Sequence, residues 1–243
     1  MSDPTAITLS GLARQYEAIA HNLANVATPG YKRIVGAFTR NGPAEGGSEG
    51  TAREAAAPAF ADTVLAVDFS QGRLVRTGRT LDVALSGPGF LVLETTEGER
   101  YTRNGVLRLG RNGQLVDGSG RTVAGTGGPI TVPADVSTTE VTIAPDGRVL
   151  ARGAVLGRLR LVEFEDPAVL VPEGAGAFRA PPEARPAEAV RTTVQQGFQE
   201  ASNVQAVTEL VGLITATRLY QANVQVMVKS GERAKALLRI AMA

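Results

Sequence analysis

Few side chains in this sequence could carry out chemistry, and histidine and cysteine set the limit. His21 is the only histidine among the 243 residues, and the sequence contains no cysteine. A Ser-His-Asp or Cys-His site, a histidine metal cluster and a thiolate metal site therefore lack the residues that they need. His21 itself falls in a predicted helix. We expect no catalytic site, no cofactor and no metal.

Acidic residues and glycine-rich segments are the remaining candidates for a site. Glu163 with Glu165 or Asp166 could form the carboxylate pair of a glycosidase, since residues i and i+2 share one face of a strand. Solvated acidic residues at a strand edge are the commoner explanation. The segments Gly118–Gly120 and Gly125–Pro129 lack the spacing of a phosphate-binding loop. Hairpin turns are expected there instead.

Charge does not indicate a nucleic-acid or membrane partner. Twenty-five Lys and Arg against 24 Asp and Glu leave a formal net charge of +1, so no overall field attracts a polyanion. Lys32, Arg33 and Arg40 could contact phosphate, but a solvated helix exit explains them equally well. No stretch is apolar enough to span a bilayer, and the N-terminal segment does not have the pattern of a cleavable signal peptide.

Heptad patterns predict a helix at each end of the chain. Apolar residues from Leu9 to Val26 recur at alternating intervals of three and four, behind an Asp3–Pro4 cap. The same pattern runs from Leu210 to Leu238, behind a predicted capping box at residues 202–205. The second helix would measure roughly 55 Å, too long for a small β domain to cover, so both stripes should be assembly surfaces. The predicted interface residues are Leu9, Leu12, Tyr16, Ile19, Leu23, Val26, Leu210, Leu213, Ile214, Tyr220, Val224, Met227 and Leu238.

Between the helices the pattern changes to short β strands. Residues 41–59 are poor in large apolar side chains, which predicts a linker or surface insertion over 34–68. Farther on, β-branched runs alternate with turn dipeptides, which predicts antiparallel hairpins. The turns are Asn104-Gly105, Asn112-Gly113, Asp117-Gly118 and Asp146-Gly147, and the candidate strands are residues 81–85, 90–94, 114–116, 141–144 and 157–163.

These patterns predict an α+β fold class. Residues 1–33 and 198–243 should form a coiled-coil-like α domain from the N- and C-terminal helices. Residues 69–190 should form a central antiparallel all-β domain. Residues 180–189 contain three prolines and should run extended where the chain leaves the β domain.

The segment from Asn22 to Arg33, with the sequence NLANVATPGYKR, should end the first helix abruptly. Asn25 tolerates the left-handed backbone of a helix C-terminus, Pro29 disfavours helix at the residue before it, and Gly30 frees the chain to turn. We expect this turn to set the angle at which the helix joins the outer domain. Its predicted residues are Asn22, Asn25, Thr28, Pro29, Gly30 and Tyr31.

This segment resembles the signature of the bacterial flagellar axial proteins, specifically the basal-body rod family. Residues 197–204 are similar to that family's approach to the C-terminal helix, and residues 81–93 and 101–116 are similar to its β domain. His21 and Ala27 depart from the residues usual there. Within the family, residues 127–133, 143–149 and 156–164 are most similar to the proximal rod subunit. The distal rod subunit or a hook-type axial subunit is the alternative.

The resemblance implies a non-enzymatic structural subunit of the rod. In that family the terminal helices pack with neighbouring copies into the axial tube that transmits torque to the hook. The implied partners are other copies, other rod and axial proteins, and the flagellar type III export apparatus, with no nucleic acid and no small-molecule substrate. The implied location is the rod of the basal body, which spans the periplasm. From the residues alone, a non-flagellar β-domain binding module with a small coiled coil stays open.

Overall fold

The computed structural model describes residues 4–40 and 60–241, and the side chains of residues 10–36, 65–229, 231, 232 and 240. The chain divides into two compact units, and each is described by itself. Unit 1 takes its described residues from 1–24, 34–66 and 205–243, and unit 2 consists of residues 25–33 and 67–204. The predicted linker 41–59, the Asp3 cap and the side chains of Leu9, Arg40 and Leu238 lie outside the described part.

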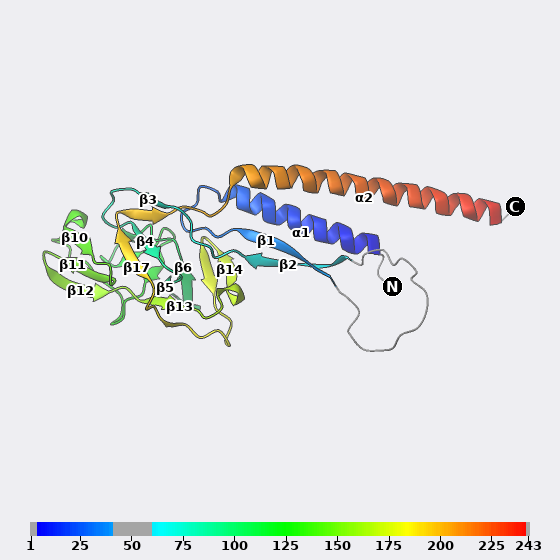
Figure 1. Cartoon of the computed structure of the whole chain (residues 1–243). Helices are drawn as coiled ribbons and strands as arrows, with labels where there is room; N and C mark the ends of the chain where they lie inside the picture. Colours follow the sequence, from blue (N-terminus) through cyan, green and yellow to red (C-terminus); the bar gives the residue numbers. More distant parts are fainter. Residues whose placement is uncertain (1–3, 41–59, 242–243) are drawn as a thin grey trace. The chain divides into compact units, whose positions relative to one another are not determined.

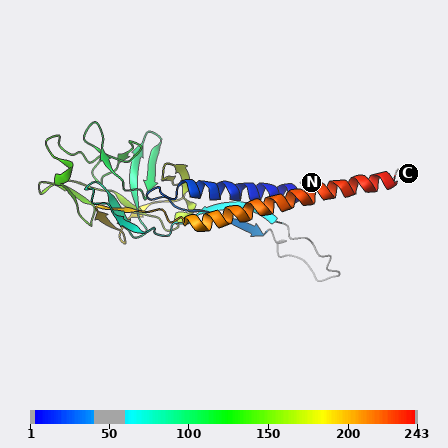
Figure 2. The ribbon, with the colours of Figure 1, turned by 90° about the horizontal axis from the view of Figure 1, so that it is seen from above.

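Unit 1 contains both α-helices of the described residues, α1 (Pro4–Ala24) and α2 (Ala206–Ala241). They lie side by side and run in opposite directions, and α2 continues beyond α1 (Figures 1 and 2). Both predicted helices are confirmed, but the predicted capping box is not. The first α2 hydrogen bond runs from the Glu209 N–H to the Gln205 carbonyl at 3.0 Å. The Ser202 hydroxyl accepts instead from the Val204 N–H, and the helix begins at Ala206, three residues later than a cap at Ser202 would place it.

The predicted fold class was wrong. The terminal helices share unit 1 with a two-stranded sheet of β1 (Ile34–Arg40) and β2 (Phe60–Val67), and α1 packs against β1. They therefore do not form a coiled-coil domain of their own. Strands dominate the rest of the chain, in several antiparallel sheets, so the protein is mostly β with two helices. The heptads predicted each helix but not what packs on it, and β1 and β2 fall inside the segment expected to be a linker.

The largest sheet of unit 2 has nine strands (Figure 1). Its main path runs β14-β15-β6-β5-β9-β8-β7, so β14 and β7 lie at opposite ends. In the central β5–β6 hairpin, Val92 pairs with Tyr101. Two further strands, β13 and β16, lie off this path, where β13 pairs with β5. The bounds are β14 (Val171–Gly174), β15 (Ala177–Arg179), β6 (Gly98–Thr102), β5 (Phe90–Thr95), β9 (Thr122–Val123), β8 (Leu115–Val116), β7 (Arg108–Leu109), β13 (Leu161–Glu163) and β16 (Ala187–Glu188).

Three smaller sheets complete unit 2. They consist of three, two and two strands, and two 3-10 turns, η1 (Thr138–Glu140) and η2 (Pro167–Val169), connect elements. The sheets are β10 (Val141–Ile143) with β11 (Arg148–Ala151) and β12 (Ala154–Arg158), then β17 (Thr193–Gln196) with β4 (Val83–Ser86), and β18 (Phe198–Glu200) with β3 (Leu74–Arg76). The strand predicted at 157–163 is divided between β12 and β13. The other four candidate strands are confirmed, with ends shifted by one or two residues.

The turn dipeptides behave differently from one another. Gly113 and Gly147 have φ of +72° and +85° in the β7–β8 and β10–β11 hairpins, as predicted for tight turns. The Asp117 carboxylate accepts the Ser119 and Arg121 N–H groups and closes the β8–β9 turn. Asn104-Gly105 closes no hairpin. A Cβ on Gly105 would lie 1.8 Å from the Val83 carbonyl oxygen, so this glycine allows two backbone segments to approach closely.

Unit 2 has two hydrophobic clusters, one aliphatic and one aromatic. The aliphatic cluster contains Leu85, Leu93, Leu107 and Val149, none of which is exposed. The aromatic cluster gathers rings that are scattered in the sequence, and its pairs meet edge to face, as aromatic quadrupoles prefer. Its rings are Phe69, Phe90, Tyr101, Phe164 and Phe178. These aromatic residues form a core rather than a stacking surface for a sugar or a base.

Tyr101 makes this aromatic cluster sensitive to alkaline pH. Burial, with help from the hydrogen-bonded Glu99, raises the pKa of Tyr101 to about 12. Folded Tyr101 therefore keeps its proton between pH 10 and about 12, where the unfolded chain loses it. We expect the free energy of unfolding to fall by roughly 2–3 kcal/mol across that window and to be unaffected by Tyr101 below it. Urea unfolding at several pH values will measure this, and the Tyr101→Phe variant should lack this component. If the free energy of unfolding of the Tyr101→Phe variant falls by the same amount, a group other than Tyr101 is responsible.

Candidate assembly site

The chain turns after α1 through a short hydrogen-bonded segment in unit 2. The Thr28 N–H donates to the Asn25 carbonyl at 3.0 Å, and the Thr28 hydroxyl to the Asn25 side-chain oxygen at 3.1 Å. Asn25 does not adopt the predicted left-handed conformation; within this segment only Gly30 does, with φ of +68°. A Cβ on Gly30 would lie 2.4 Å from the Asn104 nitrogen. Glycine is therefore required both by the backbone angle and by the contact.

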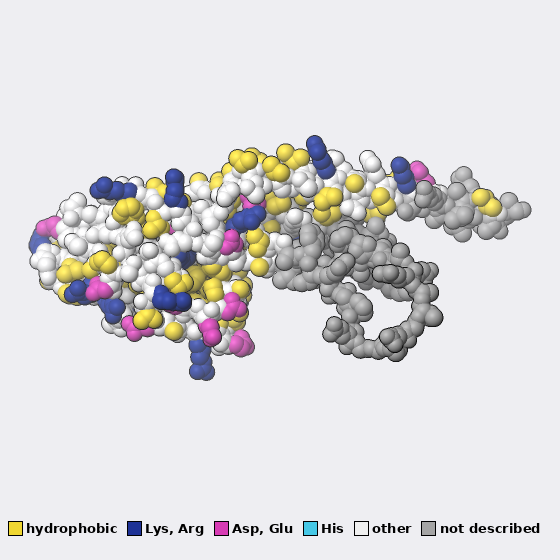
Figure 3. All heavy atoms as spheres, viewed as in Figure 1, with side chains coloured by type: hydrophobic (Ala, Val, Ile, Leu, Met, Phe, Trp, Pro, Cys, Tyr) yellow, Lys and Arg dark blue, Asp and Glu magenta, His cyan; other side chains and the backbone are white. Residues whose placement is uncertain are grey.

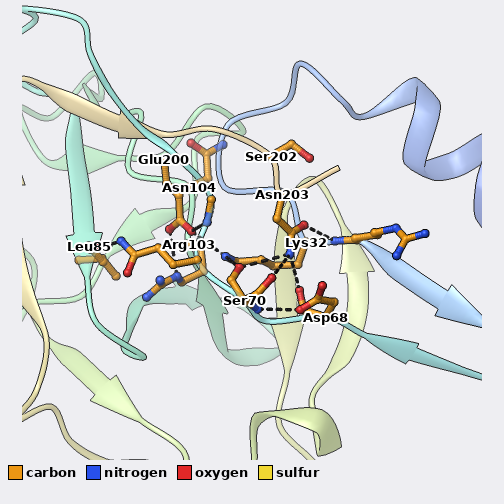
Figure 4. A network of polar contacts seen from close by, with 12 residues as sticks. Lys32, Asp68, Ser70, Leu85, Arg103, Asn104, Glu200, Ser202 and Asn203 are labelled. Carbon is orange, nitrogen blue, oxygen red and sulfur yellow. Dashed lines mark hydrogen bonds and ion pairs between the residues drawn. The ribbon is translucent and has the colours of Figure 1, made fainter. Parts of the chain in front are cut away.

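Two residues after Gly30, the chain enters a buried ion cluster (Figure 4). The Lys32 Nζ lies 2.6 Å from Glu200 Oε1, and the Arg103 Nε lies 3.1 Å from Glu200 Oε2. The side chains of Lys32 and Glu200 are fully buried, and that of Arg103 is 2% exposed. We call Lys32, Arg103 and Glu200 the ion triad. It joins the turn after α1, the end of β6 and the end of β18.

Backbone groups make four further hydrogen bonds with the triad. Lys32 donates to the Ser70 carbonyl at 2.7 Å, and Glu200 accepts the Gly72 N–H at 2.8 Å. Arg103 donates to the carbonyls of Gly87 and Gly89. Burial lowers the pKa values of Lys32 and Arg103, and the charge of Glu200 opposes both shifts. A buried carboxylate with two cations is held in place only while all three partners are present.

Asn203 ties three backbone segments together beside the triad (Figure 4). Its side-chain oxygen accepts the Arg33 N–H at 2.7 Å, and its amide donates to the Asp68 carbonyl at 2.8 Å. The Asp68 N–H in turn donates to the Arg33 carbonyl. The same amide lies 3.2 Å from the Ser70 carbonyl oxygen. The two segments that resemble the rod signatures, 22–33 and 197–204, therefore meet through Lys32–Glu200 and Arg33–Asn203.

In unit 1, Asn22 performs a similar function. Its side chain donates to the Ile34 carbonyl at 2.7 Å and accepts the Ile34 N–H at 2.8 Å, which fixes the start of β1 on α1. The same amide donates to Glu209 on α2 at 3.3 Å. Both polar residues are 1% exposed. One asparagine therefore connects α1, β1 and α2.

The predicted interface residues divide into two groups. Leu12 and Ile19 of α1 are buried, and Leu23, Val26 and Leu213 are half-buried. The remaining described members are exposed, namely Tyr16, Leu210, Ile214, Tyr220, Val224 and Met227. On the α2 side of the helix pair the contact uses small residues: an added Cβ on Gly212 would lie 3.4 Å from Ile19, and Ala216 is buried.

As a result, large apolar side chains remain on the surface of α2. Ile214 is 55% exposed, and hydrophobic side chains gather along this helix in the space-filling view (Figure 3). Contiguous exposed apolar surface of this kind marks an interaction site. In addition to the predicted residues, the exposed set contains Val207, Val211, Leu219, Val226 and Val228.

The other candidate sites have structural roles. Glu163 accepts the Thr192 hydroxyl at 2.8 Å and the Arg191 N–H at 2.9 Å, while Glu165 is exposed, so they do not form a catalytic pair. Gly125 and Gly128 exchange backbone hydrogen bonds in a turn. Lys32 is buried and paired with Glu200, so its ammonium group is not exposed for contact with a phosphate.

No group of three or more potential metal ligands occurs among the described residues. No described helix is long and apolar enough to cross a membrane.

Sequence reasoning missed Arg103, Glu200, Asn203 and Glu209 as positioning residues. Each is a polar residue near the end of a strand or the start of a helix, where exposure is the usual expectation. The one indication in the sequence was that Glu200 and Asn203 lie within residues 197–204, the second segment that resembles the rod family. Nothing in the spacing links them to Lys32 or Arg33.

Comparison with known proteins matches two regions of the chain to family models. The model of the flagellar basal body rod FlgEFG protein C-terminal domain matches residues 195–240, and that of the flagellar hook protein FlgE/F/G D1 domain matches residues 84–151. The chain is 32% identical to flagellar basal-body rod protein FlgF of Caulobacter vibrioides, over 91% of this chain and 89% of that protein. It is 34% identical to flagellar basal-body rod protein FlgG of Agrobacterium fabrum, over 94% and 95%. FlgF of Salmonella typhimurium is also 34% identical, over 90% and 88%.

Proposed function

The chain belongs to the flagellar basal-body rod protein family, and from that premise we propose that it joins the rod by packing the apolar faces of α1 and α2 against other subunits. As a member, it is a structural subunit of the flagellar rod. The observation that carries the proposal is the use of Gly212 and Ala216 for the pairing within the chain. That choice leaves the larger residues Leu210, Ile214 and Val224 exposed for neighbours.

Repetition of this contact would build a polymer. A contact between different patches on identical copies is heterologous and generates an open helix rather than a closed dimer. Burial of two or three large apolar side chains per contact, at about 1.5–3 kcal/mol each, would favour the contact and offset part of the cost of ordering the participating segments. The polymer would carry torque to the hook without enzymatic activity. Export through the flagellar type III apparatus would deliver the chain to the periplasm-spanning rod.

Both FlgF and FlgG relatives match the chain, and we assign it to the FlgF-type proximal rod. The basis for this assignment is the likeness of residues 127–133, 143–149 and 156–164 to the proximal subunit. Labelling of the subunit in isolated basal bodies will test the position. Label at the base of the rod supports the FlgF assignment, and label at the hook end supports the FlgG alternative.

The apolar face of α2 gives a direct test of polymerisation. We expect Ile214→Ser to weaken self-association of the full chain by about 2 kcal/mol, or roughly thirtyfold, because it removes one large buried side chain from each contact. Sedimentation velocity over a concentration series measures the change. Arg218→Ser, at an exposed polar position on the same helix, is the matched control.

Two results would count against polymerisation through the helices. In one, Ile214→Ser assembles as the wild-type chain does. In the other, the size of the wild-type oligomer stops increasing as concentration rises, which favours the closed coiled coil of a binding module.

A further inference from the structure

We propose that two charged grooves of unit 2, one at β7 and one at η2 just before β14, are the two halves of a charged contact between successive copies of this chain. The proposal rests on the proposed function and names a second contact, made by unit 2. It starts from the sheet order, which leaves β7 paired only with β8 and β14 paired only with β15 among the described strands. Edge strands are the places where another chain can attach.

The β7 end carries a basic groove. Two adjoining cavities of about 580 and 410 Å³ share Arg108, and Arg111 lines the first and Arg79 the second. We call this surface, defined by Arg79, Arg108 and Arg111, the basic groove. Neither cavity lining contains a carboxylate, and Arg79 pairs with Asp82, whose side chain is 2% exposed. The remaining lining mixes polar residues, among them Asn112, Gln114 and Thr138, with apolar ones.

The segments that lead into η2 and follow β15 carry an acidic groove. A cavity of about 510 Å³ lies next to η2, immediately before β14, and is lined by Glu165, Asp166 and Glu183. These three residues define the acidic groove, and Arg185 is the one cation in its lining. Within the described part of the chain, neither Glu165 nor Glu183 lies within ion-pair distance of a basic group. Their charges are therefore available to a partner.

The charges determine which groove meets which. Two basic grooves repel each other, as do two acidic grooves, so a symmetric dimer through either edge is disfavoured. A basic groove and an acidic groove attract each other, and the pairing leaves one free groove of each kind at the ends of the assembly. Such a head-to-tail contact can repeat without closing. The occupant of each groove is thus a second copy of this chain.

Side chains rather than backbone hydrogen bonds must provide the specificity of this contact. β7 is two residues long, and β14 contains Pro172, which has no N–H to donate. Exposed charges of this kind act over a Debye length of about 10 Å at 0.1 M salt. The contribution of the grooves should therefore fall as salt concentration rises, whereas the contribution of the apolar α2 face should remain.

Charge reversal in the full-length chain tests this contact. Arg111 and Glu183 are both exposed and make no ion pair within the described residues, so their reversal should leave the fold intact. We expect Arg111→Glu and Glu183→Arg each to raise the concentration for half-assembly about tenfold at low salt. The double variant should return to within about threefold of wild type, because it exchanges the two charges. Sedimentation velocity at low and high salt measures assembly, and circular dichroism checks folding.

A mixture of the two single variants and a control variant at another position complete the test. Equal amounts of the two single variants should assemble better together than either does alone, since each supplies the groove that the other has lost. Glu94→Arg changes the charge by the same amount as Glu183→Arg but lies on β5 in the middle of the sheet, and it should assemble as wild type does.

The outcomes separate this contact from the helix contact. Single reversals that assemble normally, a double variant and mixture without rescue, or an equal loss in Glu94→Arg would each overturn the charged contact. If the wild-type chain does not assemble at either salt concentration, the proposed polymerisation itself is wrong. If Ile214→Ser weakens assembly but the charge reversals do not, the chain assembles through the helix contact and the charged contact is wrong.

Discussion

Glu200→Gln should lower the free energy of unfolding of unit 2 by about 3–5 kcal/mol. The substitution removes the only negative charge of the ion triad and leaves two cations, Lys32 and Arg103, buried beside each other. Removal of one partner from a buried ion pair has this cost because the remaining charge stays desolvated without compensation. Chemical unfolding followed by tyrosine fluorescence can measure it, since Tyr31 and Tyr101 both lie in unit 2.

Two further variants show whether the triad acts as one group. Lys32→Met should cost less than Glu200→Gln, because Glu200 keeps Arg103 as its partner. The double variant should cost clearly less than the sum of the two, since residues in one network are not additive. Glu140→Gln, in which the same change is made at an exposed carboxylate paired with Arg152, is the control and should have little effect. Additive losses, or equal losses for Glu200→Gln and Glu140→Gln, would show that the triad does not stabilise the unit.

Gly30→Ala is expected to have a comparable effect, about 2–5 kcal/mol on unit 2, through the backbone rather than through charge. A left-handed conformation costs a non-glycine residue roughly 1–2 kcal/mol. The new Cβ would also lie 2.4 Å from the Asn104 nitrogen and 2.6 Å from the Arg103 carbonyl carbon, and relief of such overlap costs typically another 1–3 kcal/mol. The displacement would reach Arg103 itself and hence the triad.

Gly78→Ala is the matched control for this substitution. Gly78 has φ of +74°, but nothing lies within 4 Å of an added Cβ, so only the conformational cost should appear. The difference between the two variants in urea unfolding isolates the contact with residues 103 and 104. Equal losses would mean that the close approach at Gly30 contributes nothing.

The sequence allowed the local elements to be predicted but not the contacts that hold them. The heptad patterns at 9–26 and 210–238 predicted both helices, and four of five candidate strands formed, because periodicity reports local structure. The fold class failed because the same heptads do not reveal that β1 also packs on α1. The apolar stripe of α2 likewise did not show that Gly212 and Ala216, its smallest neighbours, would make the intramolecular contact.

The ion triad could not be predicted from residue type. Lys32 followed by Arg33 is typical of a solvated helix exit, and burial of a lysine is unusual unless a partner is present. That partner, Glu200, lies 168 residues away and belongs to β18. The turn itself was partly predictable: Gly30 does allow the chain to turn, but it is Gly30 that takes the left-handed backbone, whereas Asn25 contributes hydrogen bonds.

The Asn203 side chain has a mechanical consequence. It holds the backbone at Arg33, Asp68 and Ser70 beside its own, where the chain passes between unit 2 and the segments leading to β1, β2 and α2. A pull on any one of these segments is therefore shared among several hydrogen bonds that converge on one side chain, instead of being carried by a single bond.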